Sequence, residues 1–300
     1  MSGGARGDRD DVAAWRFEAI GTQWTVDTVD ALTDSDRAAV SALIDAFDRE
    51  WSRFREDSTV TALSALGGSR PLPVDAEAMF AVYADLDDAT SGAVSPLVGA
   101  SLEALGYDRS YSLRSRGVVS APRDWRRTVS IRDGLLHLAE PALIDIGAVG
   151  KGRLVDRVYE ELASRKPGRL TVDAGGDIRA SAAPERVGLE HPYDPRRIVG
   201  VVELADAALC ASATNRRAWG EGLHHVLDAR TGTPVRTIAA TWAIAASAMV
   251  ADAVATALFF EGGAELAHRW GVEWVRMTTA GRVEWSAGFG TQRCKAELFT

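Results

Sequence analysis

An almost entirely apolar helix near the C-terminus constrains the fold most, because it carries a carboxylate toward the interior. Residues 247–260 read Ser-Ala-Met-Val-Ala-Asp-Ala-Val-Ala-Thr-Ala-Leu-Phe-Phe, with Asp252 and Thr256 one helical turn apart. Side chains at positions i and i+4 share a helix face. An unpaired buried carboxylate costs several kcal/mol or takes up a proton. The sequence therefore requires a partner for Asp252.

Partners for this carboxylate are scarce in the neighbouring sequence. No Lys or Arg lies between Arg236 and Arg269. That leaves a distant basic residue, backbone donors, or a hard cation that prefers oxygen ligands. In the structural alternative, Thr256 donates back to a helical carbonyl and Asp252 caps a neighbouring segment. The helix alone does not decide between the cation and this alternative.

The composition is that of an ordinary globular protein, with 300 residues, 46% of them hydrophobic and 25% charged. A net charge of -8 argues against nucleic acid as the main partner. Cys210 and Cys294 match no metal or redox spacing, and no apolar run is long enough for a membrane span. Residues 1–14 are rich in Gly, Arg and Asp, so we expect a disordered tail, no signal peptide and a cytoplasmic location.

Hydrophobic periodicity predicts strands and helices in blocks, which favours an α+β fold over a doubly wound sheet. Helices are expected at 34–54, with Thr33 or Asp34 as the N-cap, and at 75–90, 97–105, 153–163 and 264–270. Strands are expected within 15–29 and at 128–131, 135–138, 143–146, 170–173, 199–204, 241–245 and, last, 273–277. Residues 182–197 contain three prolines and are expected to form an ordered surface loop.

Two glycine-rich turns carry charged side chains. The first runs from Asp145 to Gly152, where glycines would let backbone amides approach a phosphate and Lys151 would neutralise it. It is not a Walker A loop, because Gly follows the lysine, and close packing is the alternative role. The second turn places Asp173 and Asp177 around a glycine pair, where Asx-type turn chemistry is the alternative.

Two of the five histidines are adjacent, at His224 and His225, and Asp228 follows closely. Neighbouring residues on a strand point to opposite faces, so at most one histidine serves a site; we prefer His225 as a base or phosphate ligand. The chain has no Gly-x-Ser-x-Gly elbow and no His-Glu-x-x-His motif, which disfavours hydrolases and zinc enzymes of those kinds.

Seven motifs, taken together and in order, resemble the FAD:protein FMN transferase (ApbE) family, and the similarity extends from residue 15 to about 278. They are Ile20-Gly-Thr22, Ser52-Arg-Phe-Arg-Glu-Asp-Ser58, Ile144-Asp-Ile-Gly-Ala-Val-Gly-Lys-Gly152, Asp173-Ala-Gly-Gly-Asp-Ile178, His225-Val-Leu-Asp228, Thr231-Gly-Thr-Pro234 and Ala251-Asp-Ala-Val-Ala-Thr256. The resemblance implies an α+β flavin transferase fold, with mixed sheets, flanking helices and two intimately packed subdomains in a single domain at 15–300.

The resemblance also implies an activity, namely Mg²⁺-dependent transfer of FMN from FAD to a threonine of a target protein, with release of AMP. Metal ligands are then expected from the side chains of Asp252 and Thr256 and from the carbonyl of Ala148. Positions that contact or line FAD are expected at Ile20, Phe54, Asp145, Lys151, His225 and Leu227. Ile20 and Phe54 stand where the family often has Met and Tyr.

For the chemistry we hypothesise that His225 takes the acceptor proton, that Asp228 orients it and that Lys151 holds diphosphate oxygens. Two other functions stay open: hydrolysis of FAD to FMN and AMP, and flavin binding without catalysis. The last would follow from departures at Ser95 and Leu97, in Val94-Ser95-Pro96-Leu97, where many members have Phe-Asp-Pro-Thr. Asn215-Arg216 likewise replaces a Tyr-Arg pair.

Overall fold

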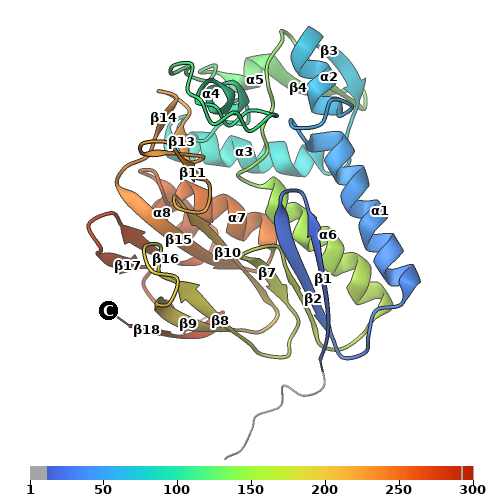
Figure 1. Cartoon of the computed structure of the whole chain (residues 1–300), viewed down its shortest axis with the longest axis vertical. Helices are drawn as coiled ribbons and strands as arrows, with labels where there is room; N and C mark the ends of the chain where they lie inside the picture. The colour runs from blue at the N-terminus through green and yellow to red at the C-terminus, as the bar shows by residue number, and fades with distance from the viewer. Residues whose placement is uncertain (1–11, 292, 300) are drawn as a thin grey trace, which may run out of the picture.

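The computed structural model describes residues 12–291 and 293–299. Its centre is an eight-stranded sheet, and every described strand pair in it is antiparallel, which differs from the expected mixed sheets. In spatial order the strands are β1 (Ala13–Ala19), β2 (Thr22–Thr28), β6 (Leu170–Asp173), β7 (Asp177–Ala180), β10 (Ala207–Ala213), β15 (Ile238–Ala245), β16 (Glu273–Thr278) and β17 (Val283–Trp285) (Figure 1).

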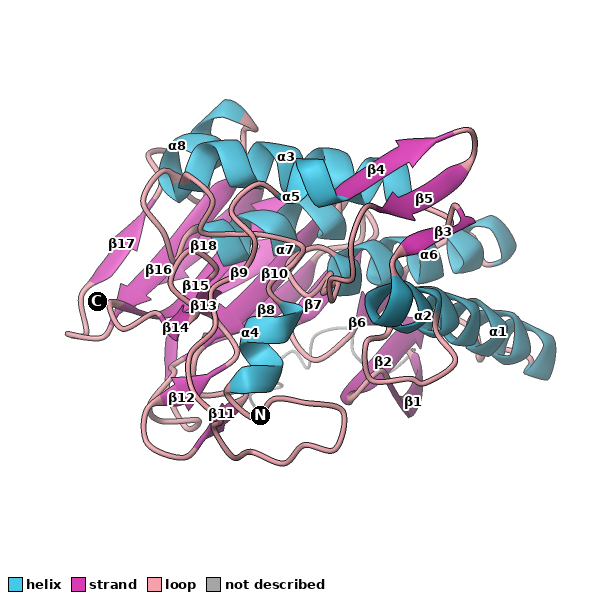
Figure 2. Ribbon diagram, turned by 90° about the horizontal axis from the view of Figure 1, so that it is seen from above, coloured by secondary structure: helices cyan, strands magenta, loops and turns pink. Residues whose placement is uncertain are grey.

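Helices cover one face of this sheet, and Figure 2 shows them gathered on one side of the strands. They are α1 (Asp34–Trp51), α3 (Ala76–Thr90), α6 (Gly150–Arg165), α7 (Ala248–Ala257) and α8 (Gly263–Arg269). The opposite face packs against a small antiparallel sheet through a second apolar cluster. The strands of that sheet are β8 (Glu185–Glu190), β9 (Ile198–Leu204) and β18 (Cys294–Leu298). The three layers confirm the α+β prediction.

The remaining elements are short. Near α1 lie α2 (Thr59–Leu66), β3 (Gly68–Pro71), β4 (Val129–Arg132) and β5 (Leu135–Leu138). The others are α4 (Gly99–Ala104), α5 (Trp125–Thr128), β11 (Ala218–Trp219), β12 (Leu223–His224), β13 (Leu227–Asp228) and β14 (Thr233–Pro234). None of the described helices is both long enough and apolar enough to cross a membrane.

Helix α1 illustrates how sequence signals become structure. Thr33 accepts a hydrogen bond from the backbone N–H of Asp36, whose carboxylate accepts from the backbone N–H of Thr33, so the two form a capping box. Val40, Ile44 and Phe47 follow at helical spacing and are buried. The helix ends at Trp51 rather than at residue 54.

Several predicted boundaries were wrong. Strand β1 begins at Ala13, inside the expected tail, while residues 1–11 lie outside the described residues. The expected loop at 182–197 contains β8, because its prolines flank the strand instead of interrupting it. Residues 143–146 form no strand, α6 begins at Gly150, and β17 and β18 follow the strand expected to be last.

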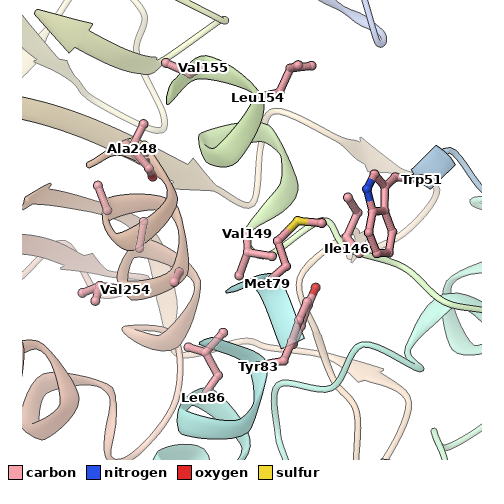
Figure 3. Close-up of a cluster of buried hydrophobic side chains, with 14 of the residues drawn as sticks. Trp51, Met79, Tyr83, Leu86, Ile146, Val149, Leu154, Val155, Ala248 and Val254 are labelled. Carbon is pink, nitrogen blue, oxygen red and sulfur yellow. Dashed lines mark hydrogen bonds between the residues drawn. The ribbon is translucent and has the colours of Figure 1, made fainter. Parts of the chain in front are cut away.

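The core joins α3, α6 and α7, and Figure 3 shows their apolar side chains meeting. Helices α6 and α7 pack closely because Gly152 has no side chain. A Cβ atom there would lie 2.2 Å from the carbonyl oxygen of Ala248 and 2.7 Å from the Cβ of Asp252. Gly152 therefore sets the distance between the two helices.

Each of these two helices also caps the other. The Oδ2 atom of Asp252, on α7, accepts a hydrogen bond from the backbone N–H of Gly152 in the first turn of α6 (2.9 Å). Asp156, on α6, accepts from the backbone N–H groups of Ala248 and Met249 at the start of α7 (2.8 and 2.9 Å). Carboxylates are favourable at helix N-termini, so the pair fixes the relative position of α6 and α7.

Candidate active site

Most of the predicted site residues line one cavity of about 450 Å³. Its walls come from the β1–β2 turn, the 145–151 turn, the end of β10 and helix α7. The predicted residues on them are Asp145, Ala148, Lys151, His225, Leu227, Asp252 and Thr256. Residues separated by more than a hundred positions in the sequence are thus brought to one space.

Two of the other three predicted residues, Ile20 and Phe54, line a second cavity of about 400 Å³. The two cavities share wall residues, among them Tyr107, Lys151 and Arg217, so they adjoin. The second cavity is rich in aromatic rings. Phe54 stacks parallel to Tyr111, with ring centroids 5.3 Å apart.

Asp252 is 3% exposed. Burial raises the pKa of its carboxyl to about 8, with a further rise from the nearby Asp177, while Lys151 and the Gly152 N–H oppose the rise. The structural alternative from the sequence is met in part, since Asp252 does cap a neighbouring helix. The hydrogen bond from Thr256 to a helical carbonyl, however, is not among those of the described residues.

Three oxygen atoms on the cavity wall are suited to a hard cation. Among the described residues, no hydrogen bond uses the carbonyl oxygen of Ala148, the Oγ1 of Thr256 or the Oδ1 of Asp252, and all three residues line the cavity. No group of three or more His, Cys, Asp or Glu that could hold a metal occurs in the part of the chain the structure describes. One carboxylate with neutral oxygens fits Mg²⁺, which typically takes its other ligands from water and substrate phosphates.

Lys151 is held by a carboxylate that the sequence did not assign to the site. Its Nζ lies 2.8 Å from the Oδ2 of the fully buried Asp177 and 3.4 Å from the carbonyl oxygen of Ala174. Burial opposes the charge of Lys151, but the carboxylates of Asp177 and Asp252 outweigh burial and raise its pKa. Lys151 therefore stays an ammonium group at the junction of the two cavities.

The two histidines have separate surroundings. His224 is buried and uses both ring nitrogens, one with the Val235 carbonyl (2.8 Å) and one with the Val226 N–H (3.3 Å). His225 lines the first cavity, and its Nδ1 has no hydrogen-bond partner among the described residues. Desolvation, followed by the positive charge of Arg217, lowers the pKa of His225 to about 3, so the ring is neutral near pH 7.

Asp228 does not orient His225 as hypothesised. Its carboxylate forms a fork with Arg230, with the Nη2 of Arg230 2.6 Å from Oδ2 and the Nε 2.9 Å from Oδ1. Asp228 also lies outside the residues that line the two cavities. From the sequence alone, Asp228 is close both to His225 and to Arg230, and nothing in the pattern shows that its carboxylate binds the arginine.

The first glycine-rich turn serves packing more than anion binding. Its expected amides are already used, because Gly147 N–H donates to Asp145 (2.7 Å) and Gly152 N–H donates to Asp252. A Cβ at Gly150 would lie 2.3 Å from the Cδ1 of Ile146. The anion-binding capacity of this turn therefore rests on Lys151.

Three further residues shape the site and were missed. Tyr83, on α3, donates from its hydroxyl to the Asp145 carbonyl (3.0 Å) and accepts from the Ala148 N–H (3.4 Å), which fixes the turn. Arg53 pairs with Asp145 and is 3% exposed. Arg217 lines both cavities and has no ion pair or side-chain hydrogen bond with any described residue. None of the three stands at a spacing that predicts a site.

Comparisons with known proteins identify the family of this chain. A model of the ApbE family matches residues 20–275. The chain belongs to the ApbE family. Its relatives include the FAD:protein FMN transferases of Treponema pallidum, 31% identical over 69% of this chain and 66% of that protein, and of Klebsiella pneumoniae, 25% identical over 82% of this chain and 77% of that protein. The chain thus spans just under two thirds of the Treponema relative.

Solved ApbE structures share the fold. The apo form of the flavinyl transferase ApbE from Pseudomonas stutzeri aligns with a TM-score of 0.79 at 24% identity, covering 94% of this chain and 96% of that one. The ApbE protein from Thermotoga maritima aligns with a TM-score of 0.78 at 22% identity, covering 94% and 99% of the two chains. The fold is therefore that of ApbE proteins.

The departures from the ApbE pattern lie in different surroundings. Ser95 lines the first cavity, whereas Leu97 is 1% exposed and belongs to the core. Asn215 donates to the Pro192 carbonyl (2.6 Å) and is not part of either cavity wall. Val94, which stands where many members have Phe, lines the same cavity, so the changes at Val94 and Ser95 alter its surface.

Proposed function

We propose that this ApbE protein transfers the FMN half of FAD to a hydroxyl group of an acceptor protein, a threonine, and releases AMP. The observation that carries the proposal is the convergence on one cavity of Lys151, His225 and the oxygens of Ala148, Asp252 and Thr256. The names of the relatives, FAD:protein FMN transferases, support the same reaction. Two adjoining cavities suit a dinucleotide better than a small single-ring substrate.

The residues that line the two cavities have different roles in this reaction. The oxygens of Ala148, Asp252 and Thr256 would hold Mg²⁺, which when bound spreads the charge that develops on the diphosphate as AMP leaves. Lys151, held by Asp177, binds a diphosphate oxygen at the cavity junction. The second cavity, with Ile20 and the Phe54 ring, receives the flavin rings.

The transfer step needs a base. The acceptor oxygen forms a bond to the FMN phosphorus, the bond from that phosphorus to the bridging oxygen breaks, and AMP departs with the bridging oxygen. The hydroxyl proton passes to His225, whose neutral ring has a nitrogen without a described partner. A bound diphosphate would supply negative charge beside this ring and raise its pKa above the low value set by desolvation and Arg217.

The test is incubation of the protein with FAD, Mg²⁺ and a threonine-containing peptide, read by mass spectrometry. A peptide that gains FMN in step with AMP release supports the transferase. AMP release that is independent of peptide, with no labelled product, would assign the protein as an FAD hydrolase. Tight FAD binding without AMP at any Mg²⁺ concentration would assign it as a flavin-binding protein.

A further inference from the structure

An exposed segment beside the second cavity has an unusual composition. In residues 109–120, here called the rim strip, every residue is exposed. The strip contains three arginines, Arg109, Arg114 and Arg116, and no acidic residue. Four large apolar side chains lie among them, namely Tyr111 (50% exposed), Leu113 (46%), Val118 (56%) and Val119 (47%). Contiguous exposed apolar groups of this kind mark interaction surfaces more often than isolated ones do.

The rim strip is held in place by backbone hydrogen bonds although its side chains are exposed. The backbone N–H of Leu113 donates to the Gly106 carbonyl (2.9 Å), and that of Arg116 donates to the Ala104 carbonyl (2.7 Å). Just before the strip, the carboxylate of Asp108 accepts hydrogen bonds from the backbone and hydroxyl groups of Ser110 and Ser112. A surface ordered before binding avoids much of the entropy cost of association.

The strip is continuous with the candidate active site. Tyr111 and Leu113 line the second cavity. The far end lies against the 229–232 turn, where a Cβ at Gly232 would be 2.1 Å from the Val119 carbonyl oxygen. Helix α4, which precedes the strip, lies at the same edge of the molecule as β11 and β12 (Figure 2), and their side chains share one apolar cluster. A macromolecule that reaches into the cavities would therefore pass over the strip.

The charge of the strip is opposite to that of the protein. The chain has a net charge of -8, yet the strip is purely basic. Arg109 lies 3.1 Å from the exposed Glu56, where such a pair is weak. Arg116 lies 3.9 Å from the buried carboxylate of Asp108, at the outer limit of an ion pair, and its own side chain is exposed. Arg114 has no ion pair among the described residues, and neither has Arg217 at the cavity junction. An acidic partner is the one this surface favours.

We propose that the rim strip docks an acidic, partly apolar segment of the acceptor protein. This inference rests on the proposed function, in which a protein hydroxyl must enter the cavities. The arginines attract and orient the acidic residues of the segment, and Tyr111, Leu113, Val118 and Val119 cover its apolar ones. Nothing in the docking step requires FAD cleavage, so docking and chemistry can be separated by experiment.

The first test compares two double charge reversals. Arg114→Glu/Arg116→Glu alters the strip, while Arg132→Glu/Arg186→Glu changes the same number of exposed arginines elsewhere. The probes are a peptide with one threonine among aspartates and leucines, and its counterpart with lysines in place of the aspartates. We expect the strip variant to lose about tenfold or more in kcat/KM for labelling of the aspartate peptide, through KM, because like charges then oppose each other. The control variant should keep wild-type values.

Binding of FAD in the absence of peptide is the internal control and should be the same in all three proteins. Equal labelling of the two peptides by the wild type, or equal loss in the strip and control variants, would overturn the proposal. If the wild type cleaves no FAD with either peptide, the proposed function fails. Docking can still be tested, because fluorescence anisotropy measures binding of the peptide without any chemistry. The labelled aspartate peptide should bind the FAD-free protein more tightly at low salt than at physiological salt, and lose that binding in the strip variant. Absence of binding by the wild type would also overturn the proposal.

Discussion

Replacing Asp252 by Asn should stabilise the metal-free protein while it removes metal-dependent activity. The carboxyl is 3% exposed, and burial raises its pKa from 3.8 to about 8. An amide has nearly the same shape and carries no charge. Its oxygen can still accept the hydrogen bond from the Gly152 N–H. The substitution therefore removes the buried charge and keeps the cap on α6.

The sign of the pH dependence follows from the two pKa values. Below pH 3.8 the carboxyl is protonated in both the folded and the unfolded chain, so it makes no difference to stability. Between 3.8 and about 8 the folded state retains a proton that the unfolded chain has lost, and the free energy of unfolding falls as the pH rises. Above about 8 the loss is complete.

The magnitude is several kcal/mol at most. Each pH unit within the window corresponds to about 1.4 kcal/mol, so the whole shift sets an upper bound of about 6 kcal/mol. Lys151 and the Gly152 N–H both stabilise the charged form. Replacing a whole buried ion pair by apolar residues is often neutral or stabilises a protein by about 1–4 kcal/mol, whereas removing one partner leaves the other charge uncompensated. Lys151 keeps Asp177 as its partner in Asp252→Asn, so we expect a gain at the low end of that range at about pH 8, shrinking as the pH falls toward 4.

The assay is urea unfolding in EDTA at about pH 5 and about pH 8, followed by the same series with Mg²⁺. Metal should raise the stability of the wild type, because a ligand that binds only the folded state stabilises it, and should leave Asp252→Asn unchanged. Asp156→Asn is the matched control. It weakens the buried cap of α7 and should destabilise at both pH values. Destabilisation by Asp252→Asn at pH 8, or a gain that is equal at both pH values, would refute the reasoning.

Three further predictions concern neighbouring groups. His225→Ala should slow FMN transfer by about 10²–10⁴-fold with FAD binding retained. Asp228→Asn should change the transfer rate little, because the carboxylate of Asp228 binds Arg230. Single-turnover rates measure both effects, and a large effect of Asp228→Asn would show that Asp228 does orient His225. Asp177→Asn removes the negative charge that lies 2.8 Å from Lys151 Nζ and should raise the KM for FAD more than it lowers kcat. Asp173→Asn serves for comparison, and unchanged steady-state kinetics would remove Asp177 from the site. Gly152→Ala places a Cβ atom 2.2 Å from the carbonyl oxygen of Ala248 and should lower the free energy of unfolding by at least about 1–3 kcal/mol. Thermal unfolding measures this loss, and a wild-type melting curve would contradict the role of Gly152 in setting the distance between α6 and α7.

The sequence predicted the elements whose pattern is local. Helices α1 and α3 follow from apolar residues at helical spacing, and the turn after β1 follows from Gly21, which has a φ of 73°. It missed β10, which reads Ala-Ala-Leu-Cys-Ala-Ser-Ala. That strand is covered on both faces, by α7 and by the outer sheet, so it shows no alternation of polar and apolar residues. A strand of small residues that is buried on both faces lacks the alternation of polar and apolar residues by which a strand is recognised in a sequence.

The site was predictable only as far as its residues share a helix face or a turn. The spacing of Asp252 and Thr256 indicated one face of a buried helix, and both residues do line the cavity. The partner of Asp252, by contrast, is a backbone N–H a hundred positions earlier in the chain, and Asp177 meets Lys151 from another layer of the fold. Such contacts depend on how α6 lies against α7 and β7, which no local pattern encodes.

The reciprocal caps between α6 and α7 give the carboxyl group of Asp252 a structural partner within the protein. One oxygen, Oδ2, is used in the structure, where it accepts the Gly152 N–H. The other, Oδ1, accepts no hydrogen bond from any residue that the structure describes, and the residue lines the cavity. A capping oxygen alone could be supplied by Asn or Ser at no electrostatic cost. The cap on α6 therefore does not account for a charge at position 252, and a variant that keeps the cap but not the charge separates this structural role from the proposed metal-binding role.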